Sequence, residues 1–229
     1  MSLFPIPATP EIPVLGETEG YAVRRIFCVG RNYEDHAKEM GVEVDREAPF
    51  YFTKAPAALC LTGTSVPYAP GTSNFHYEME LVVALGAPAF RATEEEAKAA
   101  VYAYACGLDM TRRDRQQDGK DQRRPWDLGK DFENAAVIAP LTKATDYAIK
   151  NQRITLAVNG DVKQDATLDL LIHDVPAVIA HLSGYYHLGA GDLIYTGTPA
   201  GVGPVTAGDT LHGEIEGLTP VDLTLTTPE

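Results

Sequence analysis

Residues 75–85 read Phe75-His76-Tyr77-Glu78-Met79-Glu80-Leu81-Val82-Val83-Ala84-Leu85. In a β-strand, successive side chains point to opposite faces of the sheet, so Glu78, Glu80 and Val82 share one face. The continuous apolar run from Leu81 to Leu85 is typical of a strand that is buried on both faces. The stretch therefore predicts an interior strand of a β-rich fold that carries two neighbouring carboxylates.

Two buried carboxylates on one face need a positive counter-charge. Because carboxylate oxygens are hard ligands, we expect Mg²⁺, Mn²⁺ or Ca²⁺ at Glu78 and Glu80 rather than zinc. One or two further oxygen ligands should then come from elsewhere in the chain. The alternative is that both side chains lie on a wet surface and need no ion. The apolar run that follows them favours the buried site.

The composition is that of a globular, turn-rich protein of 229 residues, with 45% hydrophobic residues, 20 Gly and 16 Pro. Its length allows one large or two small domains. Short runs of Val, Thr and Tyr favour strands. We expect an extended N-terminal arm over residues 1–20, which carry four prolines, and a single domain over residues 21–229.

The charge and the cysteines restrict the partners and the compartment. A net charge of −13 argues against binding to nucleic acid. The opening residues lack the basic start and apolar run of a signal peptide, and no stretch is apolar enough to predict a membrane span. Three cysteines without a C-x-x-C pair, Cys28, Cys60 and Cys106, favour buried reduced thiols in a cytoplasmic protein.

The first half of the chain alternates strand and helix. A strand over 21–29 precedes a short helix over 31–41, for which we predict Asn32 as the N-cap. The charged stretch 41–49 leads to a further strand over 50–54 and is a candidate lid.

The short helix carries a possible proton-transfer pair. His36 and Glu39 are three residues apart, so they lie on one helix face within reach of a shared water. The alternative is a solvent-exposed polar helix without a catalytic role.

A third carboxylate follows an apolar strand. A capping box at Thr93 begins a helix, and the run 102–108 then leads to Asp109. We predict Asp109 as the third metal ligand. The alternative is that its side chain caps a turn.

Basic residues gather between Thr111 and Lys130. In so acidic a chain, this is where an anionic ligand would bind, because arginine can hold a carboxylate through two parallel hydrogen bonds. A solvated charged loop is the alternative, since aspartates are interleaved. The basic residues here are Arg112, Arg113, Arg115, Lys120, Arg123, Arg124 and Lys130.

The second half is strand, turn and helix. Asn159-Gly160 predicts a hairpin turn, and a helix is expected from Asp174 to Gly184. The glycine-rich stretch 196–203 lacks the ending of a phosphate-binding P-loop. Its backbone amides and the Thr198 hydroxyl could still hold a carboxylate.

Taken in order, the motifs of this chain resemble the fumarylacetoacetate hydrolase family, closest to its short branch of fumarylpyruvate hydrolases and acylpyruvases. The resemblance runs from about residue 23 to residue 218. It is carried by Gly-Arg-Asn-Tyr-x-x-His-x-x-Glu-Met at 30–40, Glu-x-Glu at 78–80, Gly-Leu-Asp-Met-Thr-Arg-Arg-Asp at 107–114, Gly-Lys-Asp-Phe at 129–132, Val-Asn-Gly at 158–160 and Thr-Gly-Thr-Pro-x-Gly-Val-Gly at 196–203.

The resemblance implies an α+β, β-rich fold, a mixed β-sandwich or β-roll with a few short helices, that forms a homodimer. It implies Mg²⁺ or Mn²⁺, with Ca²⁺ a further option. The residues implied are Glu78, Glu80 and Asp109 for the metal, His36, Glu39 and Lys130 for catalysis, and Arg113, Gln116 and Thr198, to which we add Arg31, for the substrate. Many relatives have His-His-Glu where this chain has His76-Tyr77-Glu78, so no role for the second histidine is carried over.

The implied reaction is hydrolysis of a 2,4-diketo acid, an acylpyruvate such as fumarylpyruvate. His36 would take a proton from water, which attacks the distal carbonyl. Two rivals remain: an oxaloacetate decarboxylase or a related 2-oxo acid isomerase or hydratase that uses the same metal site, and a metal-stabilised binding protein without turnover. A structural metal would not explain why a His-x-x-Glu helix and an Arg-rich segment accompany the carboxylates.

Overall fold

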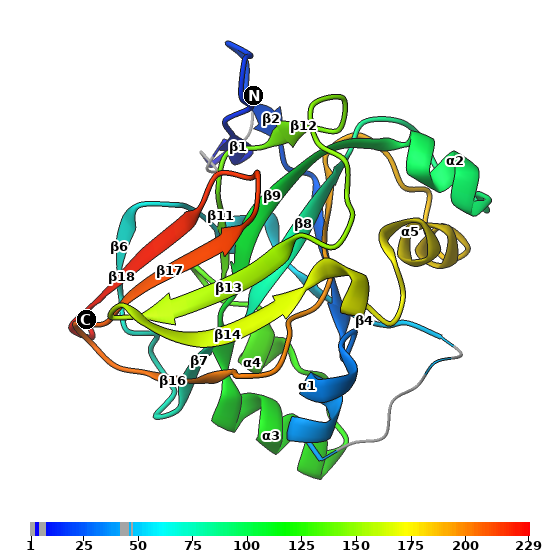
Figure 1. Ribbon diagram of the computed structural model, residues 1–229. Coiled ribbons are helices and arrows are strands. Elements are labelled where there is room, and N and C mark those ends of the chain that lie inside the picture. Colours follow the sequence, from blue (N-terminus) through cyan, green and yellow to red (C-terminus); the bar gives the residue numbers. More distant parts are fainter. Residues whose placement is uncertain (1–2, 5–7, 42–45, 47) are drawn as a thin grey trace.

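The structure of the chain, a computed structural model, describes residues 3–4, 8–41, 46 and 48–229. Within those ranges it is built mainly from strands, with five short α-helices, α1 to α5 (Figure 1). The predicted β-rich class is confirmed. The candidate lid, residues 41–49, falls largely on 42–45 and 47, which lie outside the described residues. Every helix in the described ranges is too short to span a bilayer.

The larger sheet has eight strands and carries most of the predicted site. Its order is β4-β3-β15-β8-β9-β11-β5, and β12 pairs with β9 beside that path. The β15–β3 and β11–β5 pairs are parallel and the others antiparallel, so the sheet is mixed. The strands are β3 Arg25–Gly30, β4 Phe50–Lys54, β5 Leu59–Leu61, β8 Met79–Leu85, β9 Val101–Asp109, β11 Ala136–Ile138, β12 Thr142–Lys143 and β15 Asp192–Tyr195.

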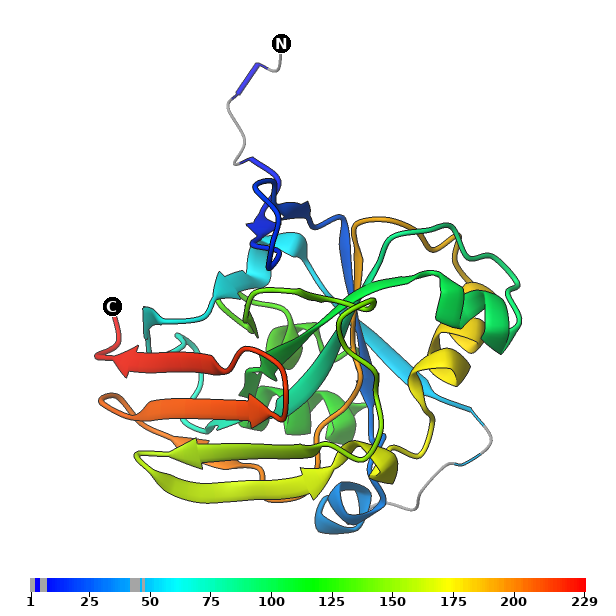
Figure 2. The ribbon, with the colours of Figure 1, turned by 45° about the horizontal axis from the view of Figure 1, so that its top comes forward.

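A second sheet of five strands, in the order β14-β13-β17-β18-β6, packs on the first. Figures 1 and 2 show β13 and β17 lying over β8 and β9. Gly213 of β17 permits this close packing, because a Cβ at that position would collide with the Met79 side chain of β8. The strands are β6 Thr64–Pro67, β13 Arg153–Val158, β14 Asp161–Thr167, β17 Thr210–Ile215 and β18 Val221–Thr226.

The predicted hairpin turn joins β13 to β14. Asn159 and Gly160 have φ values of 53° and 87°, the left-handed backbone that a tight two-residue hairpin requires at both positions. The prediction is confirmed.

The helices lie in two groups. α2 (Glu94–Ala99) and α5 (Val175–Ser183) pack against each other, whereas α3 (Arg113–Gln122) packs against α4 (Asp127–Lys130). The predicted capping box at Thr93 is present, and Asp174 caps α5 by accepting from the Ala177 N–H at 2.9 Å. Two 3₁₀ turns cover Pro56–Ala58 and Leu168–Leu170.

The N-terminal stretch contributes to the sheet structure and to the core. β1 (Glu11–Ile12) pairs antiparallel with β2 (Tyr21–Ala22), and Ile12 is fully buried. From residue 11 onward, the segment predicted as an extended arm is therefore partly packed against the protein. The three cysteines are free and buried, as predicted.

The stretch 75–85 is not one continuous strand. β7 (Phe75–Tyr77) belongs to a three-stranded sheet, β10-β7-β16, with β10 Thr111–Arg112 and β16 Gly203–Val205, whereas β8 belongs to the larger sheet. The chain changes partners at Glu78, because Tyr77 pairs with β16 and Met79 with β9. Leu81 to Leu85 are fully buried, as the apolar run predicts.

The first helix begins later than predicted. α1 covers Glu34–Glu39 and Tyr33, not Asn32, is its N-cap. The Asn32 side chain is used elsewhere: its Nδ2 donates to the carbonyls of His173 and Thr196, and its Oδ1 accepts from the His173 N–H. The N-cap prediction is wrong because Asn32 joins three loops instead of capping a helix.

The contact between α3 and α4 supports a testable prediction. A Cβ on Gly129 would lie 2.7 Å from the Gln116 nitrogen and 2.9 Å from its Cα, so Gly129→Ala must push α4 away from α3. We expect a loss of about 1–3 kcal/mol in the free energy of unfolding. We also expect lower activity, since α4 carries Lys130. Denaturant unfolding measures the loss. Gly189→Ala is the control, because its nearest atom would be Pro88 Cα at 3.9 Å. Equal stability of the two variants would contradict the prediction.

Candidate active site

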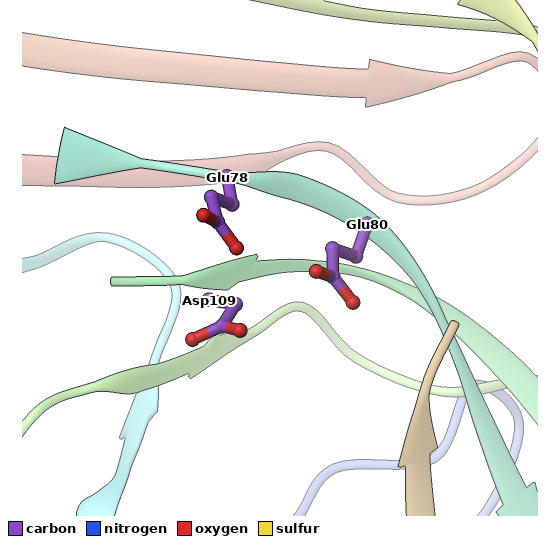
Figure 3. Close-up of side chains that lie close together, drawn as sticks. All are labelled: Glu78, Glu80 and Asp109. Carbon is purple, nitrogen blue, oxygen red and sulfur yellow. The ribbon is translucent and has the colours of Figure 1, made fainter. Parts of the chain in front are cut away.

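Three carboxylates converge where β8 and β9 run side by side. Glu80 lies on β8, Asp109 ends β9, and Glu78 precedes β8; the Asp109 N–H donates to the Glu78 carbonyl at 2.8 Å. One oxygen of each of the three side chains lies within 4.8 Å of the others. Figure 3 shows the three groups pointing toward one another. All three are buried, so the convergence predicted from the Glu-x-Glu pattern and Asp109 is confirmed.

Their charges perturb one another strongly. Burial raises the pKa of Glu80 well above its usual range, and Asp109 and Glu78 raise it further because they are like charges. Burial also acts on Glu78, but Lys130 and Arg113 outweigh it and lower the pKa of this carboxyl. The site therefore contains one stabilised carboxylate and one that resists ionisation unless a cation binds.

Lys130 is the cation in closest contact with the carboxylates. Its Nζ lies 2.7 Å from Glu78 Oε2, 2.7 Å from Asp109 Oδ2 and 2.8 Å from Thr111 Oγ1. Burial disfavours the ammonium, but Asp109 and Glu78 outweigh that effect and raise the pKa of Lys130. The side chain is therefore a fixed positive charge in the site.

Arg113 supports the site from α3. Its Nη2 donates to Glu78 Oε1 at 2.5 Å and its Nη1 to Gln116 Oε1 at 2.7 Å. Both predicted substrate residues of α3 thus point into the site and hold each other in place.

Lys54, at the end of β4, is a site residue that the sequence reasoning missed. Its fully buried Nζ lies 2.8 Å from Asp109 Oδ1 and donates to the backbone carbonyls of Met110 and Lys130. A sequence signal existed, because Lys54 shares the strand face of the aromatic Phe50 and Phe52, where a lysine is seldom buried without a partner.

The donor set fits a divalent cation. Asp109 Oδ1 is buried and accepts no hydrogen bond among the described residues, and its contact with Lys54 Nζ at 2.8 Å is an ion pair. Glu80 Oε2 accepts from the Gly197 N–H at 2.8 Å, which leaves its other oxygen for a ligand. Three carboxylates with spare acceptor capacity are the hard oxygen ligands that Mg²⁺ and Mn²⁺ prefer.

The predicted His–Glu pair adjoins this site. His36 Nδ1 lies 3.3 Å from Glu39 Oε2, and the Gly201 N–H donates to both Glu39 oxygens at 3.2 Å. Burial lowers the pKa of His36, so the imidazole is neutral near pH 7. In the tautomer that donates from Nδ1 to Glu39, Nε2 carries the lone pair that can accept a proton. The alternative of a solvent-exposed helix is wrong for His36, which is buried.

A cavity of about 30 Å³ joins these groups, with room for about two waters. Glu39 and Asp109 do not line the cavity but hold residues that do. Those of the predicted residues that line it are Arg31, His36, Glu78, Glu80, Arg113, Gln116, Lys130 and Thr198.

Two predicted substrate residues come from loops. Thr198, in the glycine-rich stretch, accepts from Gln164 Nε2 at 2.8 Å, which orients its hydroxyl. Arg31 has a left-handed backbone with φ of 60° and its guanidinium lies over the Phe50 and Trp126 rings, 5.9 Å from each centroid. Lys120, one of the basic residues expected to bind an anionic ligand, also lines the cavity, as does Trp126, which no sequence pattern indicated.

A larger hollow elsewhere is not a competing site. It measures about 1080 Å³ and lies near the N-terminal strands, where Arg24 is its only charged lining residue within the described ranges. The chemistry is concentrated in the small cavity.

The fold is a mixed β fold, and its site combines a buried carboxylate triad, a His–Glu pair and several fixed cations. These features define a class of β-rich proteins with an acidic site suited to a metal ion. The sequence matches the family described as fumarylacetoacetate (FAA) hydrolase C-terminal over residues 25–226. The chain belongs to the fumarylacetoacetate hydrolase family, as its motifs predicted.

Individual relatives support this placement. The chain is 50% identical over 188 residues to a fumarylpyruvate hydrolase of Ralstonia sp., covering 81% of this chain and 98% of the relative. It is 37% identical over 199 residues to an oxaloacetate tautomerase of Escherichia coli, covering 86% and 90%. Its fold matches, at a TM-score of 0.95 and 39% identity over 99% of this chain and 100% of the other, the crystal structure of a Pseudomonas aeruginosa fumarylpyruvate hydrolase in complex with Mn²⁺ and pyruvate.

Proposed function

We propose that the chain is a metal-dependent hydrolase that cleaves the carbon–carbon bond of a 2,4-diketo acid, with fumarylpyruvate as the favoured substrate. The products are pyruvate and a carboxylic acid. The observation that carries the proposal is that a neutral His36, held by Glu39, lines the same cavity as Glu78 and Glu80. The named activities of the Ralstonia and Pseudomonas relatives support it.

Glu78, Glu80 and Asp109 would hold Mg²⁺ or Mn²⁺. When bound, such an ion supplies a Lewis acid that polarises a carbonyl oxygen and stabilises an enolate. The Mn²⁺ and pyruvate bound by the Pseudomonas relative agree with this assignment. Ca²⁺ suits the same ligands but coordinates more loosely.

His36 would act as the general base. Its Nδ1–H donates to Glu39, and its Nε2 takes a proton from the water that attacks the distal carbonyl. A carbon–oxygen bond forms, the bond between the attacked carbon and its CH₂ neighbour breaks, and the electron pair of that bond passes to the pyruvate enolate. The enolate then takes up a proton to give pyruvate, so that one water is consumed for each molecule cleaved.

Lys130 would place a positive charge beside the oxyanion that develops on attack. It is suited to this role because its ammonium is fixed by Glu78 and Asp109 and also lines the cavity. Gln116 and Thr198 would bind polar groups of the substrate. Arg113 is held by Glu78 and Gln116, so it orients the site as much as it binds substrate.

The enzyme would work as a homodimer in the cytoplasm. Membership of the family supports the dimer, and three free buried cysteines suit a reducing compartment.

A second candidate reaction is tautomerisation or decarboxylation of oxaloacetate. The Escherichia coli relative is named an oxaloacetate tautomerase, and a Dictyostelium discoideum relative, 38% identical over 199 residues, an oxaloacetate decarboxylase. Both reactions pass through an enolate, so the same carboxylate site would serve them. Neither needs an attacking water.

A substrate panel tests the proposal. With Mg²⁺ or Mn²⁺ present, we expect rapid loss of the enol absorbance of fumarylpyruvate, slower loss for acetylpyruvate, and release of pyruvate in both cases. Oxaloacetate is assayed in parallel. Turnover of oxaloacetate without cleavage of either diketo acid would replace the hydrolase with the second candidate, and turnover of none would leave only a binding protein.

A further inference from the structure

Two partly buried cations of the cavity lining have no carboxylate partner among the described residues. Arg31 lies over Phe50 and Trp126, and the Lys120 Nζ lies 5.3 Å from the centroid of the Trp126 ring. Both side chains line the cavity. The other three cations of the site, Lys54, Lys130 and Arg113, are each paired with a carboxylate.

The two unpaired charges repel each other. Burial, together with the like charges of Arg113 and Arg31, lowers the pKa of Lys120 to about 8, although Glu78 opposes the shift. A positive potential of this kind is unfavourable in the free protein and is relieved when an anion binds. In a chain of net charge −13, two such cations beside the carboxylate triad point to an anionic ligand.

The fold builds this arrangement from three segments. Arg123, with φ of 55°, ends α3 and turns the chain back, so that the Arg124 N–H donates to the Gly119 carbonyl at 2.8 Å. Gly119 lets Trp126 return against α3, since a Cβ there would lie 3.2 Å from Trp126 Cδ1. Gly30 similarly makes room for the Phe50 ring beneath Arg31, because a Cβ at Gly30 would lie 2.5 Å from Phe50 Cδ1.

Arg113 cannot serve as the clamp for a far carboxylate as well. Its guanidinium is already engaged by Glu78 and Gln116, and its release would leave Glu78 with one cation fewer. Within the described part of the chain, the cavity cations without a carboxylate partner are therefore Arg31 and Lys120.

We propose that Arg31 and Lys120, held on Trp126, form the subsite for the terminal carboxylate of the acyl chain. This inference rests on the proposed function and narrows it to diketo acids that carry a second carboxylate at the far end. Arginine binds such a group through two parallel hydrogen bonds and lysine as a point charge. Acylpyruvates whose acyl chain carries no charge would bind without this contribution.

Lys120→Met tests the subsite independently of the bond-breaking step, because only one of two substrates carries the terminal carboxylate. We expect kcat/KM for fumarylpyruvate to fall about 10- to 100-fold, mainly through KM, with little change for acetylpyruvate. Lys120→Arg should restore much of the loss. Lys98→Met on the exposed surface of α2 is the matched control. Equal losses on both substrates, or no loss on fumarylpyruvate, would overturn the proposal.

A binding measurement keeps the inference testable if neither diketo acid is cleaved. Trp126 is the only tryptophan of the chain, so its fluorescence reports directly on the subsite. We expect fumarate to change that fluorescence in the Mg²⁺-loaded wild type and to bind at least about 10-fold more weakly to Lys120→Met. Crotonate, which has a methyl group in place of one carboxylate, should bind both proteins equally weakly. Identical titrations with fumarate and crotonate would refute the subsite whatever the outcome of the substrate panel.

Discussion

Glu80→Gln is expected to lower kcat/KM for fumarylpyruvate by about 10³-fold while leaving the metal-free protein at least as stable as the wild type. The amide is isosteric with the protonated acid and can still accept from the Gly197 N–H. Because burial, Asp109 and Glu78 all raise the pKa of Glu80, ionising this group in the absence of a cation destabilises the fold. Above the usual glutamate pKa of 4.5, the unfolded chain releases the proton more readily, so the substitution removes a penalty.

The two effects are measured by kinetics and by thermal unfolding with and without Mg²⁺ or Mn²⁺. The wild type should gain Tm on adding the ion, and Glu80→Gln should lose most of that gain. Glu19→Gln, an exposed residue, is the control. If Glu80→Gln kept the metal-induced rise in Tm, the carboxylate triad would not be the ion site.

His36→Ala is expected to reduce fumarylpyruvate hydrolysis by about 10² to 10⁴-fold, the usual contribution of a general base. Metal-dependent decarboxylation of oxaloacetate, if the wild type shows it, should be much less affected because it needs no attacking water. Lys38→Ala lies on the exposed side of the same helix and controls for damage to α1.

The pH profile of the wild type gives an independent measurement of the same role. Only the neutral imidazole can accept a proton, so kcat/KM should fall as the pH drops through the pKa of His36. Burial lowers that pKa, so the inflection should lie below the usual value of 6.5. Glu39→Gln removes a partner that raises the pKa and should shift the inflection to still lower pH.

An equal loss of both activities in His36→Ala would instead assign this residue to the enolate chemistry that the two reactions share.

Local sequence patterns predicted those parts of the fold in which the two interacting residues lie within a few positions of each other in the sequence. The capping box at Thr93 and the Asn159-Gly160 hairpin are of this kind. The shared face of Glu78 and Glu80 also followed from strand alternation. The two side chains still share a face although the chain changes sheets at Glu78, because the Glu78 carbonyl still pairs with the end of β9.

Contacts between distant parts of the chain left no such pattern. Lys54 meets Asp109 and Lys130, and Arg31 meets Trp126, across long sequence separations. Asn32 fits the rule for a helix cap, yet partners from two other loops prevail.

The basic segment hid a helix for a related reason. The buried residues of α3 are Arg113, Gln116 and Gly119, spaced three apart, so its inward face is polar and shows no apolar stripe. A helix that turns its polar face toward an active site does not have the amphipathic pattern by which helices are predicted.

The change of partners at Glu78 has a thermodynamic consequence for the whole molecule. One carboxylate of the triad sits where the chain passes from the small sheet to the large one, whereas Glu80 lies wholly within the large sheet. The separation of the ligand oxygens therefore depends on the position of the three-stranded sheet relative to the eight-stranded one. Ion affinity and sheet packing must be linked, so a substitution in the packed layers far from the cavity would weaken ion binding without altering a single ligand.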